Sequence, residues 1–222
     1  MFRGPRGPHY PLNQRTPPGI AAYWAGTLGR ADRTAVQPVE VKLPSKGRVS
    51  FVGAGTGQVL SRTAPAKFKM GVGYTYRLEI SGMPEFPGEK LYPSIEVIDR
   101  LHPPPALADK FSIPVEITRE DIDYALEGRF VTKVIYLEQP QLASPLAAPV
   151  PVETVRPDTN AIAVADQRGR PVAILRLGGR RLLSPERSPG SYGPGGPISR
   201  RRNRAMNPVV RTSGRRISPM FR

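Results

Sequence analysis

The feature that most constrains this fold is an alternation of apolar and polar residues over residues 73–81. A period of two places successive side chains on opposite faces, which predicts a half-buried β-strand. The connecting residues 81–88 contain two Pro and two Gly and predict a turn before a second strand over residues 89–99. We therefore predict a central β-hairpin. The alternating residues of its first strand are Tyr74, Tyr76, Leu78 and Ile80 against Thr75, Arg77, Glu79 and Ser81.

Shorter segments of the same kind predict further strands around this hairpin. Pro114 inside one of them predicts an edge strand, because proline cannot donate to a sheet ladder. Residues 130–137 are apolar on both faces and predict a central strand. The predicted fold class is all-β: a β-sandwich or partly open barrel of about 8–9 short antiparallel strands. The further segments are residues 39–43, 48–52, 59–60, 67–72, 113–117, 161–165 and 172–177.

One short helix is predicted near residues 119–127. Thr118 and Asp121 have the spacing of a capping box, and Gly128 is suited to end the helix. Ile122, Ala125 and Leu126 lie at positions i, i+3 and i+4, so they share the face that we expect to pack against the sheet.

The Pro and Gly residues indicate how the chain is divided. There are 27 Pro and 22 Gly, a large share for a globular chain, and they are dense at both ends. We predict a disordered arm over residues 1–37, a single β-sandwich-like domain over residues 38–178 and a disordered tail over residues 179–222. A Pro/Ala-rich linker is expected inside the domain, at residues 139–159.

The positive charge is concentrated in the termini. Of the formal net charge of +15, residues 1–37 carry +4, residues 38–178 carry +1 and residues 179–222 carry +10. Unpaired arginines bind polyanions through charge and bidentate phosphate contacts. We therefore predict that the tail binds an anionic polymer: cell wall, lipid head groups or nucleic acid. The predicted polyanion-binding residues are Arg200, Arg201, Arg202, Arg204, Arg211, Arg215 and Arg216.

The sequence predicts no catalytic, cofactor-binding or metal-binding residues. Cysteine is absent, and His102 has only Asp99 near it in the sequence, in a proline-rich bend that need not bring the two together. The helix dipole and capping explain Glu120 and Asp121, and Asp123 is expected on the exposed face of the helix. The glycines at 53–57 lack the spacing of a phosphate-binding loop.

Residues 19–29 form an uncharged apolar segment that makes a poor export signal, because two prolines open it and its hydrophobicity is moderate. We expect it to be loose or briefly helical, with Tyr23, Trp24 and Leu28 packed on the domain. No apolar run approaches the roughly 18 residues of a membrane span. Edge strands around Val59 and Pro114 could pair with a protein partner.

Several segments resemble an uncharacterised group of planctomycete β-rich proteins. The resemblance covers about residues 65–178 and is carried by residues 74–80, 91–105, 113–121, 130–138 and 169–178. It implies a bacterial protein of the cell envelope or periplasm and supplies no catalytic residues. The weak signal at residues 19–29 leaves a cytoplasmic location open.

Three functions follow as hypotheses. The first is a non-enzymatic structural or interaction protein of the cell envelope whose basic tail contacts anionic polymers. The second is a nucleic-acid-associated protein that binds through the same tail. The third is an enzyme, which would require a deep pocket lined by at least two acids among Glu79, Glu96, Asp99 and Glu116.

Overall fold

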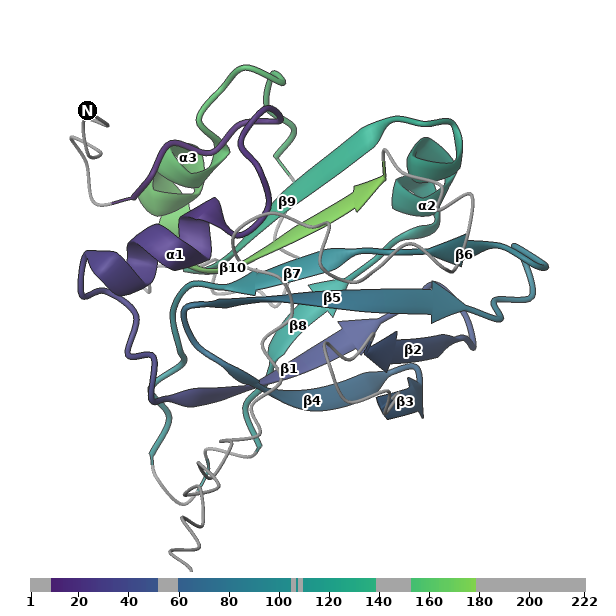
Figure 1. Ribbon diagram of the computed structural model, residues 1–222, viewed down its shortest axis with the longest axis horizontal. Coiled ribbons are helices and arrows are strands. Elements are labelled where there is room, and N and C mark those ends of the chain that lie inside the picture. Colours follow the sequence, from purple (N-terminus) through teal and green to yellow (C-terminus); the bar gives the residue numbers. More distant parts are fainter. Residues whose placement is uncertain (1–8, 52–59, 105–106, 108–109, 139–152, 179–222) are drawn as a thin grey trace, which may run out of the picture.

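The computed structural model describes residues 9–51, 60–104, 107, 110–138 and 153–178. Over these residues the chain is mostly β, with two sheets that pack face to face and do not close into a barrel, as predicted (Figure 1). The elements are α1 (Ile20–Thr27), β1 (Val36–Lys42), β2 (Arg48–Phe51), β3 (Leu60–Thr63), β4 (Ala66–Gly71), β5 (Tyr74–Ser81), β6 (Lys90–Leu91), β7 (Ser94–Val97), β8 (Ile113–Glu116), α2 (Arg119–Leu126), β9 (Phe130–Glu138), α3 (Ala161–Arg168) and β10 (Gly169–Gly178).

The smaller sheet has the order β4-β1-β8, and the larger has the order β3-β2-β5-β7-β10-β9 with β6 also paired to β5. The predicted hairpin is confirmed as the pair β5 and β7, with Tyr76 opposite Ile95. Pro114 lies in β8, an edge strand, also as predicted. The expectation that all strands are antiparallel is wrong at one pair, because β1 and β8 run parallel.

The core lies between the sheets and is lined by the apolar face of β5. Tyr76, Leu78 and Ile80 are all buried, and Phe51 of β2 packs edge-on against Phe68 of β4 with ring centroids 4.5 Å apart. The smaller sheet contributes the fully buried valines and isoleucine of β1 and β8, which are Val39, Val41, Ile113 and Val115.

The predicted central strand over residues 130–137 lies at an edge instead. This strand, β9, pairs only with β10, and its residues are mostly half-buried. It is apolar on both faces because α2 and α3 both pack against it, in addition to β10. The buried inner strand is β10, which pairs with β7 on one side and β9 on the other.

The strand predicted at residues 161–165 is also wrong, because this segment begins helix α3. Its alternating Ala, Ile, Ala, Val, Ala pattern fits a strand by period, but alanine favours the helix. Ile162 and Ala165 are the buried residues, three apart on one helical face. The helix runs directly into β10 at Gly169, so residues 161–165 do not form a strand beside it.

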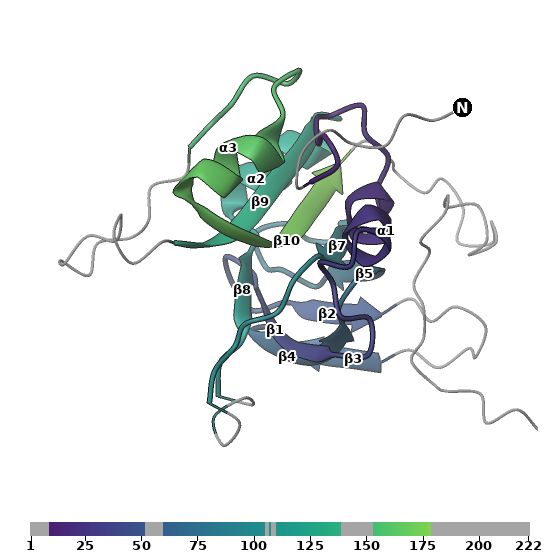
Figure 2. The ribbon, with the colours of Figure 1, turned by 90° about the vertical axis from the view of Figure 1, so that its left-hand side faces the viewer.

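Residues 9–35, which fall within the predicted disordered arm, are folded instead. Residues 9–35 pack on the sheets: Leu12 is fully buried, and α1 lies along β5 and β7 (Figure 2). The helix buries Ala21, Ala22 and Ala25. Of the three residues expected to pack on the domain, Tyr23 and Leu28 are about half exposed, and Trp24 is partly buried and stacks on Tyr10. Residues 1–8, most of the predicted linker and the tail at 179–222 lie outside the described residues.

Helix α2 has the predicted capping box. The Thr118 hydroxyl accepts a hydrogen bond from the Asp121 backbone N–H, and the Asp121 carboxylate accepts one from the Thr118 N–H at 2.7 Å. The same carboxylate also binds the Lys133 ammonium of β9. The cap therefore fixes the helix to the edge of the larger sheet.

We predict that Thr118→Ala lowers the free energy of unfolding by about 1 kcal/mol, the usual cost of losing a helix cap. The change is measured by urea denaturation followed by circular dichroism. Thr118→Ser retains the hydroxyl and should restore most of the loss. Equal free energies of unfolding for the Ala variant and the wild type would show that the cap does not stabilise the fold.

Candidate functional site

The larger sheet has a second, polar face that points away from the core. Thr75, Arg77, Glu79 and Ser81 of β5 all lie on it, opposite the apolar side chains described above. One end of this face is covered by α1, and the other end is open. These two ends have different chemistry: the covered end holds a buried ion pair, and the open end forms the candidate binding site.

Under α1, the polar face holds a buried ion pair. Glu96 of β7 is fully buried, and Arg176 of β10 is 2% exposed. The Arg176 Nε lies 3.4 Å from Glu96 Oε1, and Arg176 Nη1 donates to the backbone carbonyl of Thr16. The pair thus joins two strands to the segment that precedes α1.

The same carboxylate caps the start of α1. The Ala22 backbone N–H donates to Glu96 Oε2 at 3.1 Å, and the N–H groups of Gly19 and Ala21 are also directed at it. Gly19 takes φ 95°, a left-handed conformation that favours glycine, and no side chain of the helix caps its own first turn. Glu96 therefore supplies the negative charge that a helix N-terminus attracts.

Burial raises the pKa of the Glu96 carboxyl and lowers that of the Arg176 guanidinium, since both charges lose hydration; each charge partly offsets this for the other. Arg176 Nη2 has no hydrogen-bond partner among the described residues. The pair is thus closed to solvent and lacks part of its possible hydrogen bonds. Removing one of the two charges from such a pair costs more stability than replacing both side chains together.

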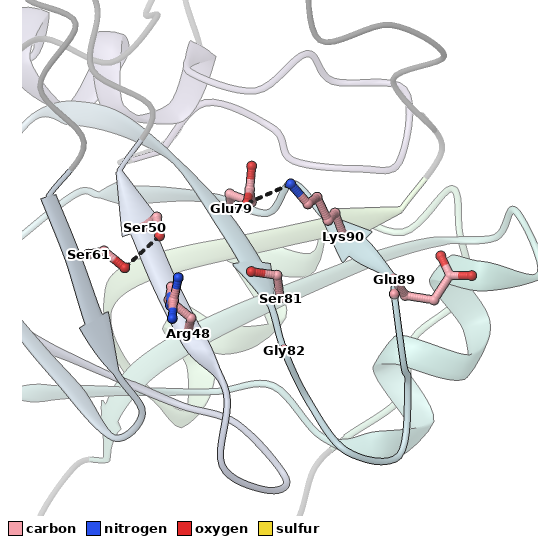
Figure 3. Close-up of a pocket in the computed structure, with 9 residues that line it drawn as sticks. Arg48, Ser50, Ser61, Glu79, Ser81, Gly82, Glu89 and Lys90 are labelled. Atoms are coloured by element: carbon pink, nitrogen blue, oxygen red, sulfur yellow. Dashed lines mark hydrogen bonds and ion pairs between the residues drawn. The ribbon is translucent and has the colours of Figure 1, made fainter.

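The open end of the polar face forms a groove (Figure 3). Its volume is about 560 Å³. Ser50 Oγ donates to Ser61 Oγ at 2.9 Å on one side, and Lys90 Nζ lies 3.7 Å from Glu79 Oε1 on the other. The lining residues are Arg48, Ser50, Ser61, Glu79, Ser81, Gly82, Gly88, Glu89 and Lys90. Two cations, two carboxylates and three hydroxyls suit the groove to binding a polar or charged group.

The structure separates most of the acids considered for catalysis. Glu79 lines the groove, whereas Glu96 is sealed under α1 and Asp99 pairs with Arg170 at 3.6 Å. Glu116 is in β8 of the other sheet. His102 is exposed. Within the described residues, no three His, Asp or Glu side chains are grouped so that they could hold a metal ion.

The acids near the predicted helix have the structural roles expected for them. Asp121 caps α2, Glu120 accepts a hydrogen bond from the Tyr124 hydroxyl at 2.6 Å, and Asp123 lies 4.0 Å from Arg119. The glycines at 53–57, Val59 and all seven predicted polyanion-binding arginines lie outside the described residues.

Sequence reasoning missed the Glu96–Arg176 pair and the groove. The available signal was a lone charge in each of two apolar strands, Ser-Ile-Glu-Val and Ile-Leu-Arg-Leu. Their partnership depends on the register of two strands, β7 and β10, in which Glu96 lies opposite Ile174 and Arg176 opposite Ser94. Local spacing does not contain that register.

Comparison with protein-family models, with curated proteins and with solved structures finds no match to this chain. None of the helices in the described part of the chain has the length and apolar character needed to cross a membrane.

We predict that Glu96→Ala releases α1 before the rest of the sandwich unfolds. Removing one partner of a buried pair costs about 3–5 kcal/mol. Trp24, the single tryptophan of the chain, lies in α1, so its fluorescence reports on this helix. In the variant, the denaturation transition seen by fluorescence should precede the one seen by circular dichroism, whereas the wild-type transitions should coincide.

The control is the double variant Glu96→Gln/Arg176→Met, which removes both charges together. It should be less destabilised than the sum of its two single variants, because neither charge is left buried alone. Additive effects would contradict the coupling of the two side chains.

A second contact of the N-terminal segment, between His9 and Asp166, is predicted to make stability depend on pH. His9 Nε2 lies 3.2 Å from Asp166 Oδ1 of α3. Burial lowers the pKa of His9 below its ordinary value of 6.5, with a further contribution from Arg30, against the opposing effects of Asp166 and Asp99. The unfolded chain therefore takes up the proton first, and this histidine reduces stability as pH falls below about 6.5.

Urea denaturation at several pH values between 8 and 5 tests this prediction. His9→Gln should flatten the decline in stability over that range. His102→Gln replaces the other histidine of the chain, on an exposed segment, and should keep the wild-type profile. Identical profiles for wild type and His9→Gln would refute the role of His9.

Proposed function

We propose that this chain is a non-enzymatic structural or interaction protein of the bacterial cell envelope, in which a β-sandwich carries an arginine-rich tail that contacts anionic polymers. The observation that carries the proposal is the separation of charge along the chain. Residues 38–178 hold 17 basic and 16 acidic residues, whereas residues 179–222 hold eleven Arg and one Glu.

The charges of the sandwich are largely matched within it. Lys67 lies 3.7 Å from Glu40, Arg170 lies 3.6 Å from Asp99, and Lys133 binds Asp121. Matched charges of this kind leave little net electrostatic field around the sandwich. The excess positive charge that would attract a polyanion therefore comes from the tail.

The envelope location is supported by the resemblance of residues 65–178 to the planctomycete group, and the tail chemistry is supported by arginine itself. A guanidinium forms two parallel hydrogen bonds with a phosphate or carboxylate, and several together release counterions from a charged polymer. The tail has only two aromatic residues on which bases could stack, Tyr192 and Phe221, which favours an envelope polymer over nucleic acid.

We predict that replacing the seven arginines Arg200, Arg201, Arg202, Arg204, Arg211, Arg215 and Arg216 by Gln removes the chain from the envelope fraction of its native cells. Wild-type protein should be released from this fraction by rising salt. A variant with Lys at the same seven positions keeps the charge and should fractionate like the wild type, with release at somewhat lower salt because bidentate contacts are lost.

Nuclease treatment separates the two polymer classes. Release of the wild-type protein by nuclease without added salt would identify nucleic acid, and not an envelope polymer, as the partner. The logarithm of the binding constant should then fall by roughly 0.7–0.9 per tenfold rise in salt for each arginine that contacts a phosphate. Unchanged fractionation of the Gln variant would show that these arginines do not hold the chain in the envelope fraction.

A further inference from the structure

One row of side chains across the groove places a cation on each side of a hydroxyl. Arg48 of β2 lies opposite Ser81 of β5, and Lys90 of β6 lies opposite Ser81 on its other side. Neighbouring strands are about 4.8 Å apart, so the two cationic residues are roughly 10 Å apart at their Cα atoms. The short serine between two long side chains leaves a hollow whose floor carries a hydroxyl (Figure 3).

The adjacent row adds hydroxyls and one carboxylate. Ser50 lies opposite both Ser61 and Glu79. Ser50 is 6% exposed, so its hydroxyl is held in place at the edge of the hollow by its hydrogen bond to Ser61. The hollow thus has fixed hydrogen-bonding groups at its base and mobile cations at its rim.

The two cations differ in availability. Lys90 is 61% exposed and lies 3.7 Å from Glu79, an arrangement that contributes little stability in solvent and can be exchanged. Within the described residues, no carboxylate lies within ion-pair distance of Arg48. The Glu89 carboxylate lies on the far side of Lys90 from Arg48 (Figure 3). The centre of the hollow is therefore more positive than the count of charges suggests.

We propose that this groove is a phosphoryl-binding site. Arg48 would bind two phosphate oxygens through its guanidinium, Ser81 would donate its hydroxyl, and Lys90 would turn from Glu79 to the bound anion. This inference deepens the proposed function, on which it rests: the tail supplies long-range, unspecific attraction, and the groove holds one phosphoryl group of the polymer in a fixed geometry.

The test uses the full chain with the seven tail arginines replaced by Gln, so that the tail does not compete. Inorganic phosphate and glycerol 3-phosphate are titrated separately, and NMR follows the Ser81 amide and the Arg48 Nε–H. Saturable shifts are expected with both probes. Arg48→Gln should weaken binding by about tenfold, the effect of losing a charge-assisted hydrogen-bonded pair.

Glu79→Gln gives the sharper outcome, because it should tighten phosphate binding by freeing Lys90 and removing a like charge. The matched control is Glu40→Gln, which breaks the Lys67–Glu40 pair at the same 3.7 Å separation elsewhere on the sandwich and should leave the affinity unchanged. Weaker binding in Glu79→Gln, or equal binding in Arg48→Gln and its parent, would overturn the site.

The two probes also identify the source of the phosphoryl group. Equal affinities indicate the free anion, and tighter binding of glycerol 3-phosphate indicates a lipid head group or polymer ester; either result supports the site. Fractionation of the chain with its native tail is measured independently, so a failed phosphate titration removes the groove and leaves the tail proposal standing.

Discussion

The position of α1 and of the segment just before it depends on the buried pair of Glu96 and Arg176. Glu96 meets the first backbone N–H groups of α1, and Arg176 holds the carbonyl of Thr16 just before it. The helix has no side-chain cap of its own and buries mainly alanines, which provide little apolar area. The electrostatic anchor therefore decides where α1 docks, and small side chains let the helix approach the sheet closely.

This anchor also divides the outer face of the larger sheet. Where Glu96 and Arg176 lie, the face is covered by α1 and the segment before it, and it is closed to solvent. Further along β5, Glu79 and Ser81 are not covered by α1, and the polar face forms the groove there. A single alternating pattern in β5 thus serves two purposes: one part of its polar face is buried for structure, and the other is available for binding.

The sequence was sufficient where the signal is local. The β5–β7 pairing, the edge position of Pro114 and the capping box at Thr118 all follow from spacing and turn chemistry, and all are confirmed. The predictions were wrong where tertiary packing determines the secondary structure or the position of a strand in the sheet. An alternating alanine-rich segment became α3, and residues 130–138 became an edge strand whose apolar faces are covered by helices. The groove could not be predicted, because it requires the register of β2, β5 and β6 together.

The near-neutral sandwich and the basic tail suit two different ranges of interaction. In the proposed arrangement, the charge of the tail attracts a polyanion over about a Debye length, roughly 8–10 Å in physiological salt, and without a fixed geometry. A groove on a rigid sheet face acts only on contact, but its hydroxyls are positioned by strand register and lose little freedom on binding. In the proposed arrangement, the tail raises the local concentration of polymer at the groove and so increases the occupancy of a weak site such as Arg48 and Ser81.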